Sequence, residues 1–174
     1  PAAQEVVVEV GHEWPGRLFR LILLAFSKTG LSLSFLLNDV DLFHSPDHVF
    51  PALAKPKSVI TIHDLSFILF PENYTWINRT YMTTMVPFSL RRAVRVVVDA
   101  ENTKKDLMSL LGVPEDKITV IHPGVDGSFR PPAAEKIAEV ERKLGISDRY
   151  ILYVGTLEPR KNIGRLLEAY SILK

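Results

Sequence analysis

The chain has 174 residues, of which 47% are hydrophobic and 24% charged, a balance typical of a globular protein rather than a disordered, collagenous or coiled-coil one. Its 21 basic and 20 acidic residues give a net charge of +1, so we expect no nucleic-acid partner. The absence of cysteine excludes disulfides and cysteine metal sites, and it is compatible with the reducing cytoplasm, where we expect this protein.

The first third of the chain contains strand patterns and one long apolar segment. Residues 17–37 are the longest apolar stretch, but two basic residues and a glycine interrupt it. A membrane-spanning helix needs about 20 consecutive apolar residues, so we favour a buried or surface-lying segment. Runs of β-branched residues predict three strands: EVVVEV (5–10), VDLFHS (40–45) and SVITIHD (58–64).

The middle of the chain predicts two helices and two further strands. Asn78 is the expected N-cap of the first helix, RTYMTTMVPFSLRRA, in which Pro87 predicts a kink or a break. Thr103 and Asp106 form an expected capping box for the second helix, KKDLMSLL, which should stop at Gly112. The two strand patterns are VRVVVDA (94–100) and KITVIHP (117–123).

The last part of the chain follows a proline pair in FRPPAAEK. Helical patterns at 133–145 and 162–174 flank one more strand pattern, YILYVGT at 150–156. Alternating strands and helices imply right-handed βαβ units, so we predict an α/β fold with a Rossmann-like, doubly wound parallel sheet.

The expected domain organisation follows from this composition shift. One strand and one helix cannot enclose a core, so the end of the chain should be the beginning of a second α/β unit. We expect residues 1–132 to form a first domain, 133–148 a linker helix and 149–174 the beginning of a second domain.

Two predicted strands end in histidine. His63 and Asp64 end one strand, and ligands of open α/β sheets gather at such strand ends. A histidine there can exchange a proton near neutral pH or bond a substrate hydroxyl; the alternative is a histidine bonded only to backbone. His122 precedes Pro123 and Gly124, and it either lines the same crevice or merely belongs to a tight turn.

Other charged residues indicate anion binding more strongly than metal binding. Arg160 and Lys161 precede the last predicted helix, whose unpaired amides and dipole favour an anion, so they predict a phosphate or diphosphate clamp. The alternative is a solvated loop. Asp39 and Asp41 supply too few ligands to hold a cation, so a solvated turn is favoured and no metal site is predicted.

A cluster of basic residues lies in the middle of the chain. It either meets an anionic membrane surface or forms a solvated face, and acidic residues between its members favour the solvated face. The cluster consists of Arg91, Arg92, Arg95, Lys104 and Lys105.

Two stretches together resemble the nucleotide-sugar glycosyltransferases of group 1, family 4, which have the GT-B fold. They are VITIHDLSFILFPENYTWINRTYMTTMVPFSLRRAVRVVVDAENTKKDLMSLLGVPEDKITVIHPGVDGSFRPP and YILYVGTLEPRKNIGRLLEAYSILK. The resemblance implies two Rossmann-like domains that face each other across a cleft. It also implies a retaining, metal-independent transfer, without a cofactor, from a nucleotide diphosphate sugar to a sugar, lipid or glycan acceptor.

The resemblance also implies roles for individual residues. His63 matches the catalytic histidine that faces the donor sugar, and Arg160 and Lys161 match the basic pair at the donor diphosphate. Gly155 matches the glycine that lets the backbone approach the donor. Asp64, His122 and Gly124 are the further residues expected to line the cleft.

Several features depart from the family pattern. Neither the usual glycine-rich loop nor the pair of glutamates seven residues apart has a counterpart, and Ala100 stands where serine is common. We therefore expect a fragment truncated at both ends and inactive by itself. Two charge-assisted contacts contribute at most about 6 kcal/mol, whereas micromolar binding needs about 8 kcal/mol.

The sequence leaves a second class of function open. The alternative is a non-catalytic α/β module that binds a phosphorylated ligand or assembles with another chain. An unpaired strand at 150–156 would favour self-association. Under the transferase interpretation the expected partners are the sugar donor and acceptor, with peripheral contact at the inner face of the membrane.

Overall fold

The computed structural model describes residues 16–29, 32–34, 40–55, 57–146 and 150–173. It divides into two units, residues 1–122 and 123–174, and each is considered by itself. The strand expected at 5–10 lies outside the described residues.

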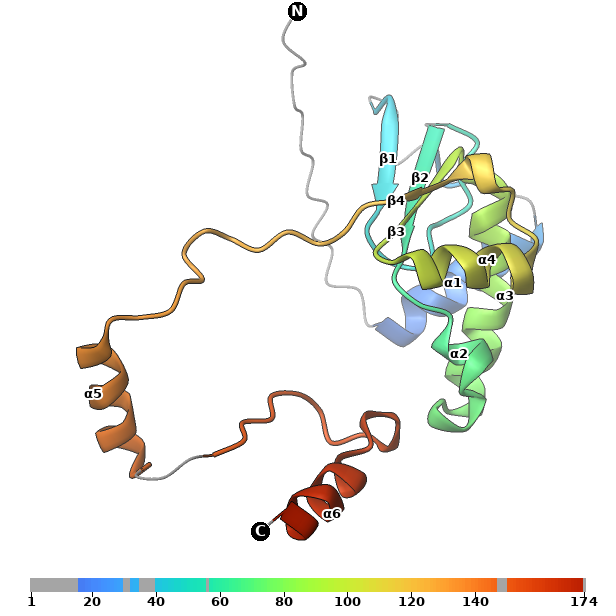
Figure 1. The fold of residues 1–174 in the computed structure, drawn as a ribbon. Helices are drawn as coiled ribbons and strands as arrows, with labels where there is room; N and C mark the ends of the chain where they lie inside the picture. The colour runs from blue at the N-terminus through green and yellow to red at the C-terminus, as the bar shows by residue number, and fades with distance from the viewer. Residues whose placement is uncertain (1–15, 30–31, 35–39, 56, 147–149, 174) are drawn as a thin grey trace, which may run out of the picture. The chain divides into compact units, whose positions relative to one another are not determined.

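Four parallel strands form the sheet of the first unit, in the order β1-β2-β3-β4 (Figure 1). The predicted α/β class with a Rossmann-like parallel sheet is confirmed. Ile62 pairs with Val98, and Val98 pairs with Val120, so the residues that follow these strands emerge at one edge of the sheet. The strands are β1 Leu42–Ser45, β2 Lys57–Ile62, β3 Arg95–Val98 and β4 Ile118–Val120.

Helices cover this sheet. The longest, α3, packs against β2 and also contacts α1 and α2, while α4 packs against β3 and β4 (Figure 1). The α-helices are α1 Gly16–Thr29, α2 Ser66–Leu69, α3 Trp76–Arg92 and α4 Glu101–Leu111, and short 3₁₀ turns are η2 Pro71–Asn73 and η3 Glu115–Lys117.

Two apolar clusters hold these layers together. In the first, Ile62 and Val98 of the sheet are fully buried beneath Leu107 of α4 and other apolar side chains. In the second, Leu23 of α1 packs with Met85 of α3. The apolar segment at 17–37 therefore serves in part to pack α1 onto α3, and no helix in the described ranges is long and apolar enough to cross a membrane.

The predicted N-cap of α3 was wrong. The helix begins at Trp76, and the side chain of Thr75 accepts a hydrogen bond from the backbone N–H of Asn78 at 3.3 Å. Thr75 has the extended backbone of an N-cap, whereas Asn78 already lies inside the first turn. The helix also runs through Pro87 to Arg92 without a break, because its buried residues on either side of the proline pack into the core.

The predicted capping box of α4 was also wrong. The helix begins at Glu101, after Ala100, which offers no side-chain cap. Thr103 is only 6% exposed, and its hydroxyl donates to the backbone carbonyl of His63 at 3.0 Å. The predicted end at Gly112 is confirmed, with the left-handed backbone (φ 63°) that glycine adopts without strain.

The second unit contains both predicted helices, α5 Ala134–Leu144 and α6 Ile163–Leu173, with a 3₁₀ turn η4 at Pro159–Lys161. The strand predicted at 150–156 is absent from the structure, because no described segment hydrogen-bonds alongside it and a strand is defined by its ladder. The division into units falls between His122 and Pro123, and the expected domain roles stay predictions.

Candidate functional site

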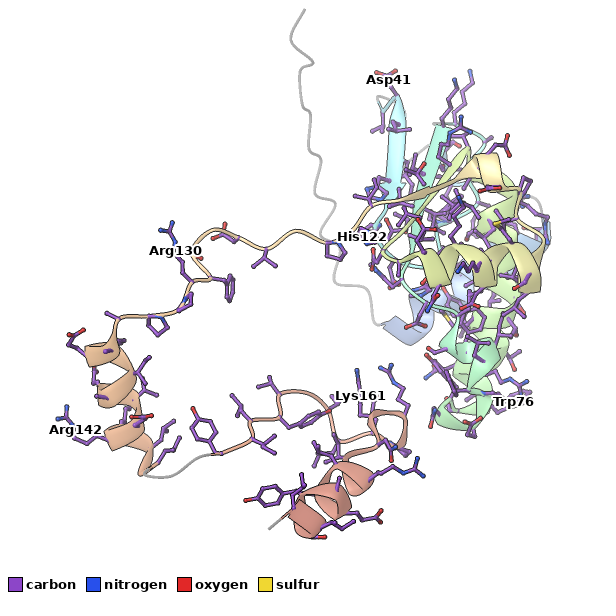
Figure 2. The ribbon with its side chains drawn as sticks, in the orientation of Figure 1. Asp41, Trp76, His122, Arg130, Arg142 and Lys161 are labelled. Atoms are coloured by element: carbon purple, nitrogen blue, oxygen red, sulfur yellow. The ribbon has the colours of Figure 1, made fainter. Side chains whose placement is uncertain are left out.

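The candidate site lies where the four parallel strands end. Pro46 follows β1, His63 follows β2 and Asp99 follows β3. His122, labelled in Figure 2, lies two residues beyond β4. Ligands of open α/β sheets bind at this edge. The side chain of His63 is 47% exposed and that of Asp99 is 30% exposed, so both remain accessible to solvent.

Hydrogen bonds hold the His63 ring on both of its nitrogens. Nδ1 lies 2.5 Å from Oδ2 of Asp99, and Nε2 lies 2.9 Å from the backbone oxygen of Pro46. A carboxylate and a carbonyl oxygen only accept hydrogen bonds, so this arrangement suits the doubly protonated ring. The hydrogen bond to Asp99 raises the pKa of His63, although partial burial opposes the shift.

A second histidine lies beside this ring. The rings of His48 and His63 meet edge to face, with 5.6 Å between their centroids. Nδ1 of His48 bonds Oδ1 of Asp47 at 2.6 Å, and its Nε2 lies 3.1 Å from the backbone oxygen of Asp64. Burial raises the pKa of Asp47, but the hydrogen bonds from His48 outweigh it and hold that pKa below its usual value.

Asp64 supports the loop after β2. Its Oδ1 accepts from the backbone N–H of Ser66 at 2.9 Å and from the Ser66 hydroxyl at 2.5 Å. The same hydroxyl contacts the hydroxyl of Tyr74 at 2.5 Å. These bonds tie the carboxylate to the beginning of α2, and the expected cleft-lining role of Asp64 stays a prediction.

Asp99 joins two histidines. Its carboxylate bonds His63, and its backbone oxygen lies 2.9 Å from Nδ1 of His122. Figure 2 labels His122 just beyond the end of β4. The sheet therefore brings the predicted residues His63, Asp64 and His122 to one edge.

The predicted donor residues lie in the second unit. Gly155 has φ 154°, and a Cβ there would lie 2.8 Å from the hydroxyl of Tyr153, so a larger residue would displace that side chain. Gly124 belongs to the same unit, where its Cβ position is open. Arg160 and Lys161 end η4 and, as predicted, precede a helix, since α6 begins after Asn162. Figure 2 labels Lys161 in this loop.

Arg160 has an acidic partner in this loop. Its Nε lies 2.6 Å from Oε2 of Glu158, whose Oε1 accepts from the Thr156 hydroxyl at 2.9 Å. The hydrogen bond from Arg160 lowers the pKa of Glu158. An anion bound by Arg160 and Lys161 would therefore compete with the Glu158 carboxylate.

The sequence reasoning missed three residues. Asp99 lies near the end of the strand predicted at 94–100, so the rule that selects His63 applies to it as well, but the sequence pattern indicates it only as an acidic residue that interrupts the basic cluster. Thr103 has the sequence pattern of a helix cap, and no sequence pattern indicates a role for Glu158. Each of them contacts a predicted site residue.

Metal ligands do not gather in the part of the chain that the structure describes: no three His, Cys, Asp or Glu side chains are grouped there as a metal ion requires. Asp41 is exposed at the beginning of β1, whereas Asp39 lies outside the described residues. The solvated turn at this position stays a prediction.

The fold and the site together define a class: a Rossmann-like α/β protein whose histidine and carboxylate meet at the ligand-binding edge of a parallel sheet. Residues 1–129 match the family model described as Glycosyltransferase Family 4. The chain belongs to glycosyltransferase family 4, and the resemblance seen in the sequence is confirmed.

The region that aligns with each curated relative cited here is a smaller share of the relative than of this chain. O-antigen chain mannosyltransferase B of Escherichia coli is 29% identical over 133 residues, which cover 76% of this chain and 35% of that protein. Serotype-specific mannosyltransferase WbdA of Escherichia coli is 29% identical over 122 residues, 67% of this chain and 15% of that protein. D-inositol 3-phosphate glycosyltransferase of Mycobacterium bovis (strain BCG / Pasteur 1173P2) is 30% identical over 81 residues, 47% of this chain and 17% of that protein.

Proposed function

We propose that this chain is part of a retaining, metal-independent glycosyltransferase that moves a sugar from a nucleotide diphosphate sugar to a sugar, lipid or glycan acceptor. The observation that carries the proposal is the family match over residues 1–129, within which His63 stands at the ligand-binding edge of the sheet. The chain spans 15 to 35% of the length of the two mannosyltransferases cited above, so the activity is proposed for the longer protein of which it would be a part.

In this proposal His63 contacts the donor sugar near the reacting carbon. Its Nε2–H donates to an oxygen in the structure, the carbonyl of Pro46, and a sugar oxygen is an acceptor of the same kind. Because Nδ1 is bonded to a carboxylate, the ring keeps its orientation when a sugar oxygen takes the place of the Pro46 carbonyl as the acceptor of this N–H. A fixed hydrogen-bond donor lowers the barrier when it points at the place where charge develops.

Arg160 and Lys161 bind the diphosphate of the donor in this proposal. The leaving diphosphate gains charge in the transition state, so two cations before a helix N-terminus stabilise it. Gly155 lets the backbone approach the donor. Support comes from the exposure of both cations and their place before α6.

The names of two relatives support mannose as the first donor sugar to test. We propose a cytoplasmic enzyme whose acceptor brings it to the inner face of the membrane. No helix in the described part of the chain is long and apolar enough to cross a membrane.

The test is a transfer assay with the full-length product of the gene that encodes this chain. The nucleotide diphosphate derivatives of mannose and glucose serve as donors, with and without a chelator, and NMR of the product gives its anomeric configuration. We expect chelator-insensitive transfer with retention. We also expect His63→Gln to lower kcat by about 100-fold or more, and Lys161→Gln to raise KM. Lys136→Gln, an exposed change on α5, is the matched control.

The assay also separates the two classes of function. Sugar transfer that is unaffected by His63→Gln would refute the proposed role of this histidine. Binding of a nucleotide diphosphate without transfer from any donor would refute the transferase and favour the non-catalytic α/β module.

A further inference from the structure

Asp99 contacts no substrate in the proposed mechanism, but it makes two contacts at the edge of the sheet. Its side chain bonds His63 on β2, and its backbone oxygen bonds His122 beyond β4. It occupies the end of β3, the strand between these two. A single residue in the middle of the edge therefore connects both histidines.

Three bonds fix the position of His63, and only one of them involves a charged group. Pro46 accepts from Nε2 through a backbone oxygen, and Thr103 donates to the His63 carbonyl through a buried hydroxyl. The Asp99 carboxylate accepts from Nδ1. Charge-assisted hydrogen bonds are about twice as strong as neutral ones, so Asp99 dominates the orientation of the ring.

Other titratable groups face His63 less directly. The Asp47 carboxylate bonds the neighbouring ring of His48, and the Asp64 carboxylate bonds Ser66. The His48 ring meets His63 through an edge-to-face contact and not through a shared proton. Among these groups Asp99 alone has its carboxylate against a nitrogen of His63.

We propose that Asp99 is the positioning residue of this site, which holds His63 doubly protonated and keeps its Nε2–H directed at the acceptor position that the Pro46 carbonyl occupies in the structure and that a ligand oxygen would take. This inference rests on the proposed function for its catalytic consequence, but the protonation of His63 can be measured without any activity. Asp99 touches no reacting atom in this scheme. It acts by fixing the direction and the charge of the histidine.

The first experiment follows the histidine ring signals of the 174-residue chain by NMR as the pH is varied. The His63 signal is assigned by its loss in His63→Gln. Asp99→Asn keeps the shape and an acceptor oxygen but removes the charge, so the His63 transition should move to lower pH. Asp41→Asn removes the same charge at the beginning of β1 and should leave that transition in place.

The result decides the proposal directly. A His63 transition that is unchanged in Asp99→Asn, or shifted equally in Asp41→Asn, would overturn it. If Asp99→Asn does not fold, as judged by circular dichroism, Asp99→Ser tests the same loss of charge with a smaller side chain.

The second experiment measures transfer by the full-length enzyme against pH. Asp99→Asn should lower kcat/KM by about 10- to 100-fold, the effect of losing one charge-assisted hydrogen bond. The alkaline fall of the profile should move to lower pH, which a purely structural role would not cause. Unchanged rates and profile would refute the positioning role. Absence of transfer by the wild type would refute the proposed function, while the NMR result would still decide whether Asp99 holds the proton on His63.

Discussion

The hydrogen bond from the buried hydroxyl of Thr103 joins α4 to the site, and its contribution to stability can be tested directly. Thr103→Val keeps the shape of the side chain but removes the donor to the His63 carbonyl, at 3.0 Å in the structure. A neutral hydrogen bond contributes about 0.5–1.5 kcal/mol to stability, and a carbonyl left without a partner adds to the cost. Valine and threonine have similar helix propensity. We therefore expect the free energy of unfolding to fall by about 1 kcal/mol.

Urea denaturation at neutral pH, followed by far-ultraviolet circular dichroism, measures this change. Thr83→Val is the matched control, because the Thr83 hydroxyl also donates to a backbone carbonyl, that of Arg79 at 2.9 Å, but does so on the exposed surface of α3. We expect the control to change stability by less than about 0.5 kcal/mol. A loss for Thr103→Val no larger than that of the control would show that this bond gives no net stability.

Three further predictions concern protonation, anion binding and the core. The hydrogen bond to Asp99 raises the pKa of His63 above its ordinary 6.5, so this bond contributes its full stability below pH 6.5 and loses it as the pH rises through the raised pKa. The midpoint of urea denaturation should therefore fall as the pH is raised from about 5.5 to 8.5, and His63→Gln should lose this pH dependence. Glu158→Gln removes a carboxylate that pairs with Arg160, so titration calorimetry should show pyrophosphate binding tightened about two- to fivefold, with Glu168→Gln as the control. Unchanged affinity would mean that Glu158 does not compete. Ser89→Ala leaves the buried backbone N–H of Phe50 without its acceptor and should cost about 1–3 kcal/mol in urea denaturation, whereas Ser109→Ala on α4 should cost far less.

Much of the first unit could be predicted because its strands are buried. The β-branched runs around Ile60 and Val96 became parallel strands, since only a sheet covered by helices buries such runs completely. Gly112 ended its helix as expected because the left-handed backbone there is cheap only for glycine. Helix beginnings were less predictable, since Thr75 and Asn78 are both good caps and only the fold decides between them.

The strand expected at 150–156 shows the limit of local pattern. Its run of aromatic and β-branched residues suits a strand, but a strand also needs a neighbour to accept and donate its backbone hydrogen bonds. None of the described segments supplies that ladder, and the apolar side chains of Ile151, Leu152 and Val154 are exposed.

The site could be predicted only in part. His63 was found because it ends a strand, which is a local property. Its contact with Asp99 depends on the register that places Ile62 opposite Val98, and no short stretch of sequence encodes register between strands this far apart. The bond from Thr103 was missed because its hydroxyl serves a distant carbonyl rather than its own helix.

The bonds at the edge of the sheet also bear on how the protein folds. His63 meets Pro46 across 17 positions of sequence, Asp99 across 36 and Thr103 across 40, so each bond closes a long loop. Loop closure costs entropy before any contact repays it, and contacts of this range therefore form only once the strands have docked. In partly folded chains the His63 ring should remain hydrated and without these hydrogen bonds. It should form them when the sheet is complete. In a refolding experiment, the His63 NMR signal would then show when the native fold forms.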